Sequence, residues 1–366
     1  MANQVVYGFE TLQDRLSQRI GDNLIDEVNT AITTAVDFHN QQMNAIMDLF
    51  VAPTTKAKTR YRHPFTTRNQ PLDQFGRPRP VKGAQSYDVA FPLQMSGSRM
   101  GWTWQNSANV TVADVQETIY SIMMGDQRWV FDHILAALFQ DDGWTYLDDD
   151  DDIGSLTIEG LANGDSFIYS MYSGSDVGAT DDHILAQANA IGSGSDNPYP
   201  TILAELEEHP ENGSGPFIAF IPTALKATTT ALGTFNPVRD PNITPGSSSD
   251  TLTGSLGVTV PGGDRMILGY EDSGIWIVEY PRLPSEHIIA VSAGGAPPLG
   301  MRQPEPVEQQ GFAEVPADMD SSPFPFMQRS WIRQAGFGGW NRVGGVAYRI
   351  GNGTYAVPTG YSAPMP

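Results

Sequence analysis

Five consecutive aspartates, Asp148 to Asp152, are the densest set of potential metal ligands in the sequence. Carboxylate oxygens are the ligands that Ca²⁺ prefers, so the run suggests a calcium site. The EF-hand pattern does not fit it, because with Gly154 at the sixth loop position the fifth is Ile153 and the twelfth is Gly160 instead of glutamate. We interpret the run as a solvated acidic turn, with a weak divalent-ion site at a subunit contact as the alternative.

The sequence lacks the other common patterns of catalytic chemistry. The six histidines, at positions 39, 63, 133, 183, 209 and 287, are scattered, and none belongs to an H-E-x-x-H motif. There is no G-x-S-x-G motif, no P-loop, and no cysteine to act as a nucleophile or thiolate ligand. Because 42 acidic residues make some carboxylate pair inevitable, such a pair carries no information. We predict no enzyme activity, no cofactor and no bound metal.

The charge distribution is the strongest chemical signal. The chain carries a net charge of −21, yet the window from 56 to 82 holds eight basic residues and one acid, Asp73, for a net charge of +7. The remainder has 13 basic against 41 acidic residues, a net charge of −28. The basic residues of this window are Lys56, Lys58, Arg60, Arg62, Arg68, Arg77, Arg79 and Lys82.

Three interpretations of the basic window compete: a solvated loop, a nucleic-acid contact, or a surface that docks on another copy of the chain. The acidic remainder would repel a phosphate backbone, whereas another copy offers a complementary acidic surface. Charge complementarity of this kind sets the register of an interface more than its strength. We therefore favour an intersubunit contact.

One long helix stands out among the elements that must position these residues. From Thr111 to Asp142 the apolar residues recur mostly every three or four positions, which predicts one continuous rod. Thr111 suits the N-cap and Asp114 a shortened capping box. Gly125 interrupts the rod at a cost of about 1 kcal/mol. The sequence Asp141-Asp142-Gly143 is expected to end it.

The segments before the rod differ in character. Residues 9 to 50 keep a helical spacing, and Pro53 is expected to end that arm. Residues 53 to 110 contain repeated prolines and short alternating stretches at 59–62 and 87–93, which predict a two-stranded ribbon with a tip at Gln70 to Arg79. Such a ribbon is only marginally stable alone, so we expect it to rest on a neighbour.

The segments after the rod predict a mixed helix and strand region without internal repeats. Gly336 to Gly339 is interpreted as a turn. No run of eighteen apolar residues occurs, so no membrane span is expected. The predicted helices are 181–191, 200–209 and 223–232, and the predicted strands are 166–171, 217–221, 266–270, 275–280, 287–291, 328–334, 346–350 and 355–357.

The order of these elements resembles the major capsid protein of tailed bacteriophages, whose fold is shared with encapsulins and the herpesvirus capsid floor. The resemblance covers nearly the whole chain, is architectural, and implies an α+β fold. It assigns residues 1–52 to an N-terminal arm, 53–110 to an extended β-hairpin loop, and 111–159 to a peripheral domain with a spine helix. An axial α/β domain would span 160–295, and the strands of 296–366 would return to the peripheral and axial domains.

The resemblance implies a function in assembly instead of catalysis. The chain would self-assemble through pentamers and hexamers into an icosahedral shell that encloses double-stranded DNA without reading its sequence. Scaffold, portal and decoration proteins would be further partners, with no membrane involved. The protein would be made in the host cytoplasm and reside in the virion.

Three alternatives remain open at the level of sequence. An encapsulin-like compartment has the same fold and would hold cargo proteins instead of a genome. A monomeric β-rich hydrolase or calcium-binding adhesin would use the run Asp148 to Asp152. A phage tail or portal component accounts less readily for a ribbon followed by a rod helix.

Overall fold

The computed structural model describes residues 25–62, 71–77, 86–102, 109–148, 153–172, 179–237, 266–315 and 327–365. The chain divides into two compact units, which we call the helical unit and the sheet unit. The helical unit comprises residues 1–43, 94–130 and 304–334, and the sheet unit comprises 44–93, 131–303 and 335–366.

The rod helix is present as α4, Val112–Phe139, with 28 residues. Its predicted capping box is confirmed: the Thr111 backbone N–H donates to Asp114 Oδ2 at 2.9 Å, and the Asp114 N–H donates to Thr111 Oγ1 at 3.3 Å. These bonds satisfy donors that have no partner inside the helix. The last turn ends three residues before the predicted Asp142.

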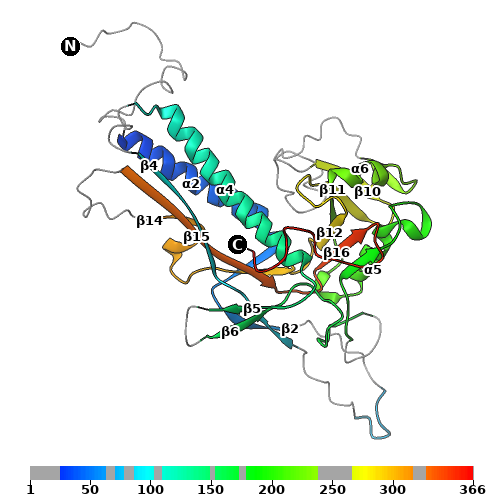
Figure 1. Ribbon diagram of the computed structural model, residues 1–366. Helices are drawn as coiled ribbons and strands as arrows, with labels where there is room; N and C mark the ends of the chain where they lie inside the picture. Colours follow the sequence, from blue (N-terminus) through cyan, green and yellow to red (C-terminus); the bar gives the residue numbers. More distant parts are fainter. Residues whose placement is uncertain are drawn as a thin grey trace, which may run out of the picture. The chain divides into compact units, whose positions relative to one another are not determined.

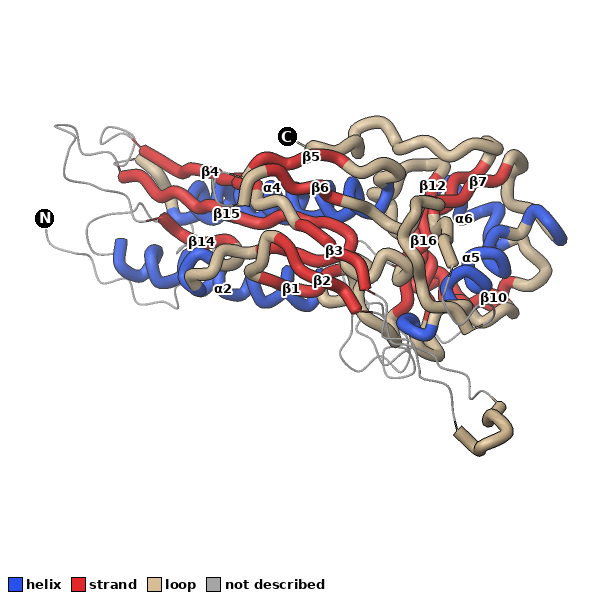
Figure 2. The backbone as a smooth tube through the Cα atoms, turned by 90° about the horizontal axis from the view of Figure 1, so that it is seen from below, coloured by secondary structure: helices blue, strands red, loops and turns tan. Residues whose placement is uncertain are grey.

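In the helical unit α4 packs beside helix α2, Ile25–Met47 (Figure 1). The two helices share one core with strands β4, Gln94–Trp102, β14, Phe312–Val315, and the first part of β15, Met327–Gly339. Figure 2 shows these three strands side by side, and β15 pairs with both of the others. The shared core consists of Ile32, Val36, Met100, Val115, Ile119, Phe312 and Trp331.

The core of the sheet unit is a seven-stranded mixed sheet in the order β7-β16-β12-β8-β11-β10-β9. Its central strand β8, Phe217–Ile221, is buried at every position, as an uninterrupted apolar run predicts. The N-cap of α5, Pro198–Glu207, is Asn197, whose side chain accepts the Tyr199 N–H. The strands are β7, Ile184–Gln187, β9, Phe235–Pro237, β10, Met266–Glu271, β11, Ile275–Glu279, β12, His287–Ser292, and β16, Gly345–Ile350; the other helix is α6, Thr223–Thr230.

Shorter elements complete the sheet unit. The predicted ribbon is present as β2, Lys58–Arg62, antiparallel to β3, Ser86–Ala90. A second hairpin pairs β5, Trp144–Leu147, with β6, Ser155–Ile158, and the aspartate run falls between these two strands in the sequence. The one-turn helices are η1, Gly194–Asp196, and η2, Pro210–Asn212; η3, Val307–Gln309, belongs to the helical unit.

The N-terminal helix ends earlier than predicted. The part of the predicted arm before Ile25 lies outside the described residues, and α2 stops at Met47, not at Pro53. Pro53 instead lies within β1, Val51–Thr54, which pairs in parallel with β13, Leu299–Arg302. β1 ends the order of its sheet, and an edge strand tolerates a proline because one side of it needs no donor.

Three predicted elements were wrong. Residues 181–191 contain strand β7 instead of a helix, because residues 184–187 pair in parallel with β16. In 166–171 only a single bridge forms, between Tyr169 and Ala179, and 355–357 contains no strand. For residues 184–187 a pairing partner distant in sequence decided the outcome, which local spacing does not encode.

The predicted turn at Gly336 to Gly339 is also wrong. These residues continue β15 and pair with β13; neither β13 nor β14 is among the strands that the sequence predicts. The glycines are needed because other chain segments approach closely. A Cβ on Gly338 would lie 2.7 Å from the Ala90 carbonyl oxygen, and one on Gly336 would collide with the Pro92 carbonyl.

Candidate assembly surfaces and buried polar clusters

The basic ribbon partly neutralises itself. Arg60 on β2 donates through Nε to Asp88 Oδ1 on β3 at 2.9 Å, and the Lys58 ammonium lies 3.8 Å from Asp88 Oδ2. The hydrogen bond with Arg60 lowers the pKa of Asp88, which is solvent-exposed. Asp88 lies outside the window from 56 to 82, so the sequence count of +7 did not include it.

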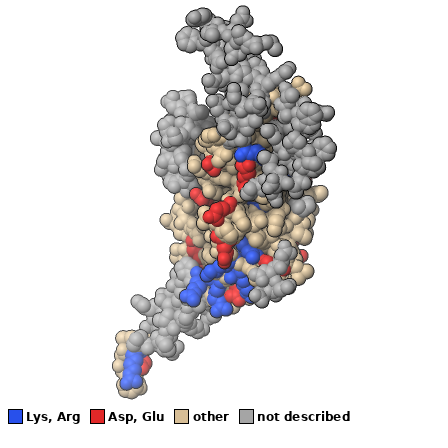
Figure 3. Space-filling view, turned by 90° about the vertical axis from the view of Figure 1, so that its left-hand side faces the viewer, with Lys and Arg blue, Asp and Glu red and all other residues tan. Residues whose placement is uncertain are grey.

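Lys56 and Arg62 of the same ribbon are exposed to solvent. Lys and Arg side chains gather at the level of the β2–β3 hairpin in the lower half of Figure 3. Of the eight predicted contact residues, Arg68, Arg79 and Lys82 lie outside the described residues. The intersubunit contact itself remains a prediction.

Aromatic residues anchor the base of the ribbon inside the sheet unit. Tyr61 and Tyr87 stack with ring centroids 5.3 Å apart. The Tyr87 hydroxyl donates to the Trp340 carbonyl at 2.8 Å and accepts the Arg342 N–H at 3.1 Å. Burial of its ring raises the pKa of Tyr87 well above its ordinary value, so the hydroxyl keeps its proton. The ribbon therefore emerges from a fixed base.

Arg342 next to this anchor is completely buried. Its guanidinium donates to the carbonyls of Gly160 and Leu161 at 2.8 and 2.9 Å and to Asp165 Oδ2 at 2.6 Å. It also lies 5.0 Å from the centroid of the Phe167 ring. The pairing satisfies the buried charge and fixes the segment that follows β6.

The predicted ribbon tip is described from 71 to 77. The Asp73 carboxylate accepts the backbone N–H groups of Phe75 and Arg77, both at 2.8 Å, and Gly76 adopts a positive φ of 73°. This side chain-capped turn holds Leu72 and Phe75 in solvent, 60% and 74% exposed. Arg77 lies 5.9 Å from the Phe75 ring centroid. The tip thus presents apolar surface beside a cation.

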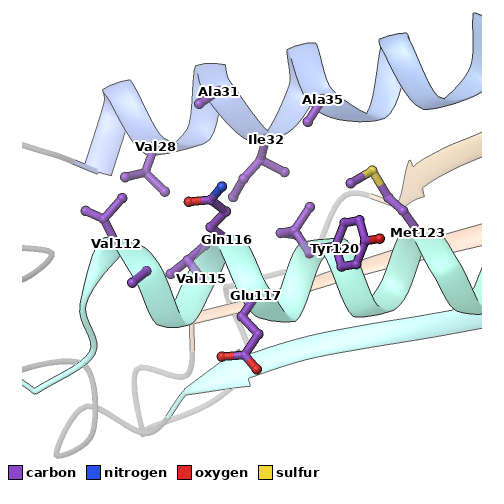
Figure 4. A pocket seen from close by; sticks show the side chains of 12 residues that line it. Val28, Ala31, Ile32, Ala35, Val112, Val115, Gln116, Glu117, Tyr120 and Met123 are labelled. Atoms are coloured by element: carbon purple, nitrogen blue, oxygen red, sulfur yellow. The ribbon is translucent and has the colours of Figure 1, made fainter. Parts of the chain in front are cut away.

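The helical unit contains an apolar groove between its two helices. Its volume is about 620 Å³, and it is lined from α2 by Val28, Ile32 and Ala35 and from α4 by Val115 and Tyr120, among others. Figure 4 shows these side chains facing one another from the two helices. The lining is mostly apolar, and its polar side-chain groups belong to Gln116, Glu117 and Tyr120.

A buried ion cluster also lies in the helical unit. Arg333 binds Asp126 with two hydrogen bonds, of 2.6 and 2.7 Å, and His39 Nε2 lies 2.8 Å from Asp126 Oδ2. Burial by itself would raise the pKa of Asp126, but the hydrogen bonds with His39 and Arg333 lower it overall. Two hydrogen bonds between one guanidinium and one carboxylate make a strong pair of fixed geometry, so we interpret this cluster as structural.

The sheet unit brings together residues that the sequence separates. His183 and His209, both completely buried, approach with their Nε2 atoms 3.1 Å apart. Asp181 Oδ2 lies 2.9 Å from the first and 2.6 Å from the second, and Glu208 Oε1 lies 3.6 Å from His209 Nε2. The spacings D-x-H and E-H were the only sequence signal, and neither is specific.

The neighbours within this cluster shift the pKa values of Asp181, His209 and Glu208. Burial alone would raise the pKa of Asp181, but hydrogen bonds with both histidines hold it well below its ordinary value. Burial alone would lower the pKa of His209, but its bond with Asp181 raises it. Burial, followed by the nearby Asp181 charge, raises the pKa of Glu208 to about 7.

The aspartate run is only partly described, because 149–152 lie outside the described residues. Asp148 forms an ion pair with Arg302, and both side chains are nearly buried. Its carboxylate is therefore already committed to a cation within the chain. Among the helices that the structure describes, none is both long and apolar enough to cross a membrane.

Comparison with known proteins identifies the fold. No family model and no curated protein matches the sequence. A structure from Mycobacterium phage Patience, at 18% identity, covers 100% of this chain and 99% of its own with a TM-score of 0.67. The capsid of cyanophage P-SCSP1u is also similar, with 8% identity over 83% of this chain and 87% of that one and a TM-score of 0.48. The mature capsid of bacteriophage PhiM1 matches with 10% identity over 83% of this chain and 86% of that one and a TM-score of 0.45.

The chain is therefore an α+β protein with the fold of the structure from Mycobacterium phage Patience, which confirms the phage capsid fold that the sequence resemblance predicted. The match to that structure spans 100% of this chain and 99% of the other.

Proposed function

We propose that this chain is the coat subunit of a tailed phage, and that its copies assemble into an icosahedral shell around double-stranded DNA. The observation that carries the proposal is the similarity to a phage structure over the full length of both chains. Fold similarity alone does not specify function, so the surfaces must also suit assembly. The β2–β3 ribbon and its tip supply such surfaces.

The ribbon suits a contact between copies for two physical reasons. Its exposed cations face solvent while the rest of the chain carries a net charge of −28, so a neighbouring copy offers complementary charge. Its tip exposes Leu72 and Phe75, which gain stability when a neighbour buries them. Repeated around rotation axes, such contacts close into a shell and become collectively strong.

The charge distribution also suits a container for DNA. An acidic interior surface repels the phosphate backbone, so the genome packs without adhering to the wall. The protein would then reside in the virion, act without catalysis, and meet scaffold, portal and decoration proteins at shell vertices and surfaces.

The test is electron microscopy of the purified chain after size exclusion, across a range of salt concentrations. We expect closed hollow particles or rings of five or six copies. Nucleic acid inside particles isolated from infected cells would support a coat protein, whereas packed protein cargo would point to an encapsulin-like compartment. A monomer under all conditions would contradict assembly altogether.

A further inference from the structure

The histidine cluster of the sheet unit has a fixed arrangement of protons. His183 Nδ1 lies 2.9 Å from the Gly345 carbonyl oxygen, and His209 Nδ1 lies 2.7 Å from the Ser170 carbonyl oxygen. A carbonyl oxygen only accepts, so each Nδ1 carries a proton and donates it. In the neutral rings, both Nε2 atoms therefore hold free lone pairs.

Those two lone pairs point at each other and at a carboxylate. The Nε2 atoms are 3.1 Å apart, and Asp181 Oδ2 lies 2.9 and 2.6 Å from them. Three electron-pair donors at these distances repel unless a positive charge lies among them, which is either a proton on an Nε2 atom or a metal ion. Both rings are completely buried, so bulk water does not supply the compensation.

We propose that Asp181, His183, His209 and Glu208 form a binding site for a divalent transition-metal ion of the Zn²⁺ type. One ligand atom from each residue lies within 4.8 Å of all the others. Ligands about 2.0–2.1 Å from a tetrahedral zinc ion are about 3.3 Å apart. Four separations in this cluster, of 2.6, 2.9, 3.1 and 3.6 Å, lie on either side of that value. Imidazole nitrogens favour zinc and similar ions over Ca²⁺ or Mg²⁺.

The surroundings of the cluster match those of known metal sites. Histidine ligands usually donate their second ring N–H to a backbone carbonyl or carboxylate, which fixes the ring, and both rings do so here. The Glu208 side chain is 29% exposed and that of Asp181 is 11% exposed, so the carboxylate side gives an ion access from solvent.

The ion would join segments that lie far apart in the sequence. Asp181 and His183 precede β7, whereas Glu208 and His209 follow α5, and the rings are held by Ser170 and by Gly345 on β16. Metal binding would thus cross-link the start of the edge strand β7 to the end of helix α5, and would stabilise a chain without disulfides.

The decisive measurement uses the full chain, purified without a histidine tag. After dialysis against a chelator, the protein is titrated with Zn²⁺ and with Co²⁺. We expect one ion per chain by elemental analysis, the strong visible absorption of tetrahedral Co²⁺, and a higher melting temperature with metal than without it. None of these readouts depends on shell assembly, so the result is independent of the proposed function.

Variants identify the ligands. His183→Gln and His209→Gln should lose stoichiometric binding, and Glu208→Gln, at a partly exposed position, should weaken it at least tenfold. His287→Gln is the matched control, because His287 is also buried but donates from Nε2 to the Ala356 carbonyl, outside the cluster. It should bind metal like the unaltered chain.

Two results would overturn the proposal that these four residues bind a metal ion. The first is unaltered protein that binds no Zn²⁺ and gives no Co²⁺ absorption, which would mean that a proton, and not a metal, bridges the cluster. The second is full metal stoichiometry in folded His209→Gln. If both histidine variants fail to fold, the titration of the unaltered chain still decides the question.

Discussion

The helical unit contains a buried ion pair between Asp126 and Arg333. Asp126 and Arg333 are almost completely buried, and each satisfies the other with two hydrogen bonds. Removing one member of such a pair leaves the other charge uncompensated in a medium of low dielectric constant. A neutral substitution should therefore cost far more here than at an exposed pair.

Asp126→Asn should lower the free energy of unfolding by about 3–5 kcal/mol, because Arg333 keeps its buried charge and loses its counter-ion. Urea denaturation monitored by tryptophan fluorescence measures the change. The matched control is Asp88→Asn, which breaks the exposed pairs with Arg60 and Lys58 and should cost less than about 1 kcal/mol. Equal losses of unfolding free energy in the two variants would contradict this role of the buried pair of Asp126 and Arg333.

The same pair predicts a specific sensitivity to acid. The folded pKa of Asp126 is depressed, so its stabilisation is fully present above the unfolded pKa of about 3.9 and is lost as pH falls through the folded value. The stability difference between the unaltered chain and Asp126→Asn should thus be constant near neutrality and shrink below about pH 4. Urea unfolding of both proteins at pH 7 and pH 3 measures this difference. The same difference at both pH values would refute the predicted sensitivity to acid.

At the scale of elements, two glycines should respond oppositely to alanine. A Cβ at Gly125 on α4 would meet nothing within 4 Å, so Gly125→Ala should stabilise the chain by about 1 kcal/mol through helix propensity. A Cβ at Gly338 on β15 would lie 2.7 Å from the Ala90 carbonyl oxygen, so Gly338→Ala should destabilise by about 1–3 kcal/mol. Thermal unfolding measures both; stabilisation by Gly338→Ala would show that β15 has room there.

The ribbon tip should contribute to assembly but not to the stability of the chain. Leu72→Ser combined with Phe75→Ser should leave the unfolding free energy of the chain unchanged, because both side chains are exposed. It should raise the protein concentration needed for assembly at least tenfold, since burying each side chain against a neighbour is worth about 1.5–3 kcal/mol. Light scattering against concentration measures this threshold.

Leu147→Ser is the control for the tip variant. Leu147 on β5 is as exposed as Phe75, at 74%, but lies outside the ribbon. It should leave the assembly threshold close to that of the unaltered chain. An equal shift from this control would mean that general surface hydrophobicity, and not the tip, drives assembly.

At the scale of the whole molecule, the exposed basic residues Lys56, Arg62 and Arg77 should control assembly. Lys56→Glu, Arg62→Glu and Arg77→Glu together should abolish shells while the chain still folds, because these exposed positions would then repel the acidic surface of the next copy. Assembly of the unaltered chain should weaken with salt, since exposed charges are screened beyond about 8 Å at physiological ionic strength.

The control for charge reversal preserves both pairing and net charge. Arg60→Asp with Asp88→Arg inverts the ion pair across β2 and β3 without changing the total. These shells should form as in the unaltered chain. Unimpaired shells from the triple variant would refute electrostatic docking and leave the apolar tip as the assembly contact.

The sequence by itself determined the features that local physics controls. The spacing of Val115 and Ile119 and the pair Thr111 and Asp114 defined the rod and its cap, because helix periodicity and capping involve neighbours within four residues. The alternation at 59–62 and 87–90 defined the ribbon, and the buried run Phe217–Ile221 defined a central strand.

Only the tertiary structure decided what depends on partners far along the chain. Gly336 to Gly339 became strand because β13 pairs with it, and residues 184–187 became strand because β16 does. The sequence gives no sign that any cation of the basic window is paired, but in the structure Arg60 on β2 donates to Asp88 on β3. His183 and His209 looked scattered until the fold placed their Nε2 atoms 3.1 Å apart, because strand pairing sets such contacts and local spacing carries no record of them.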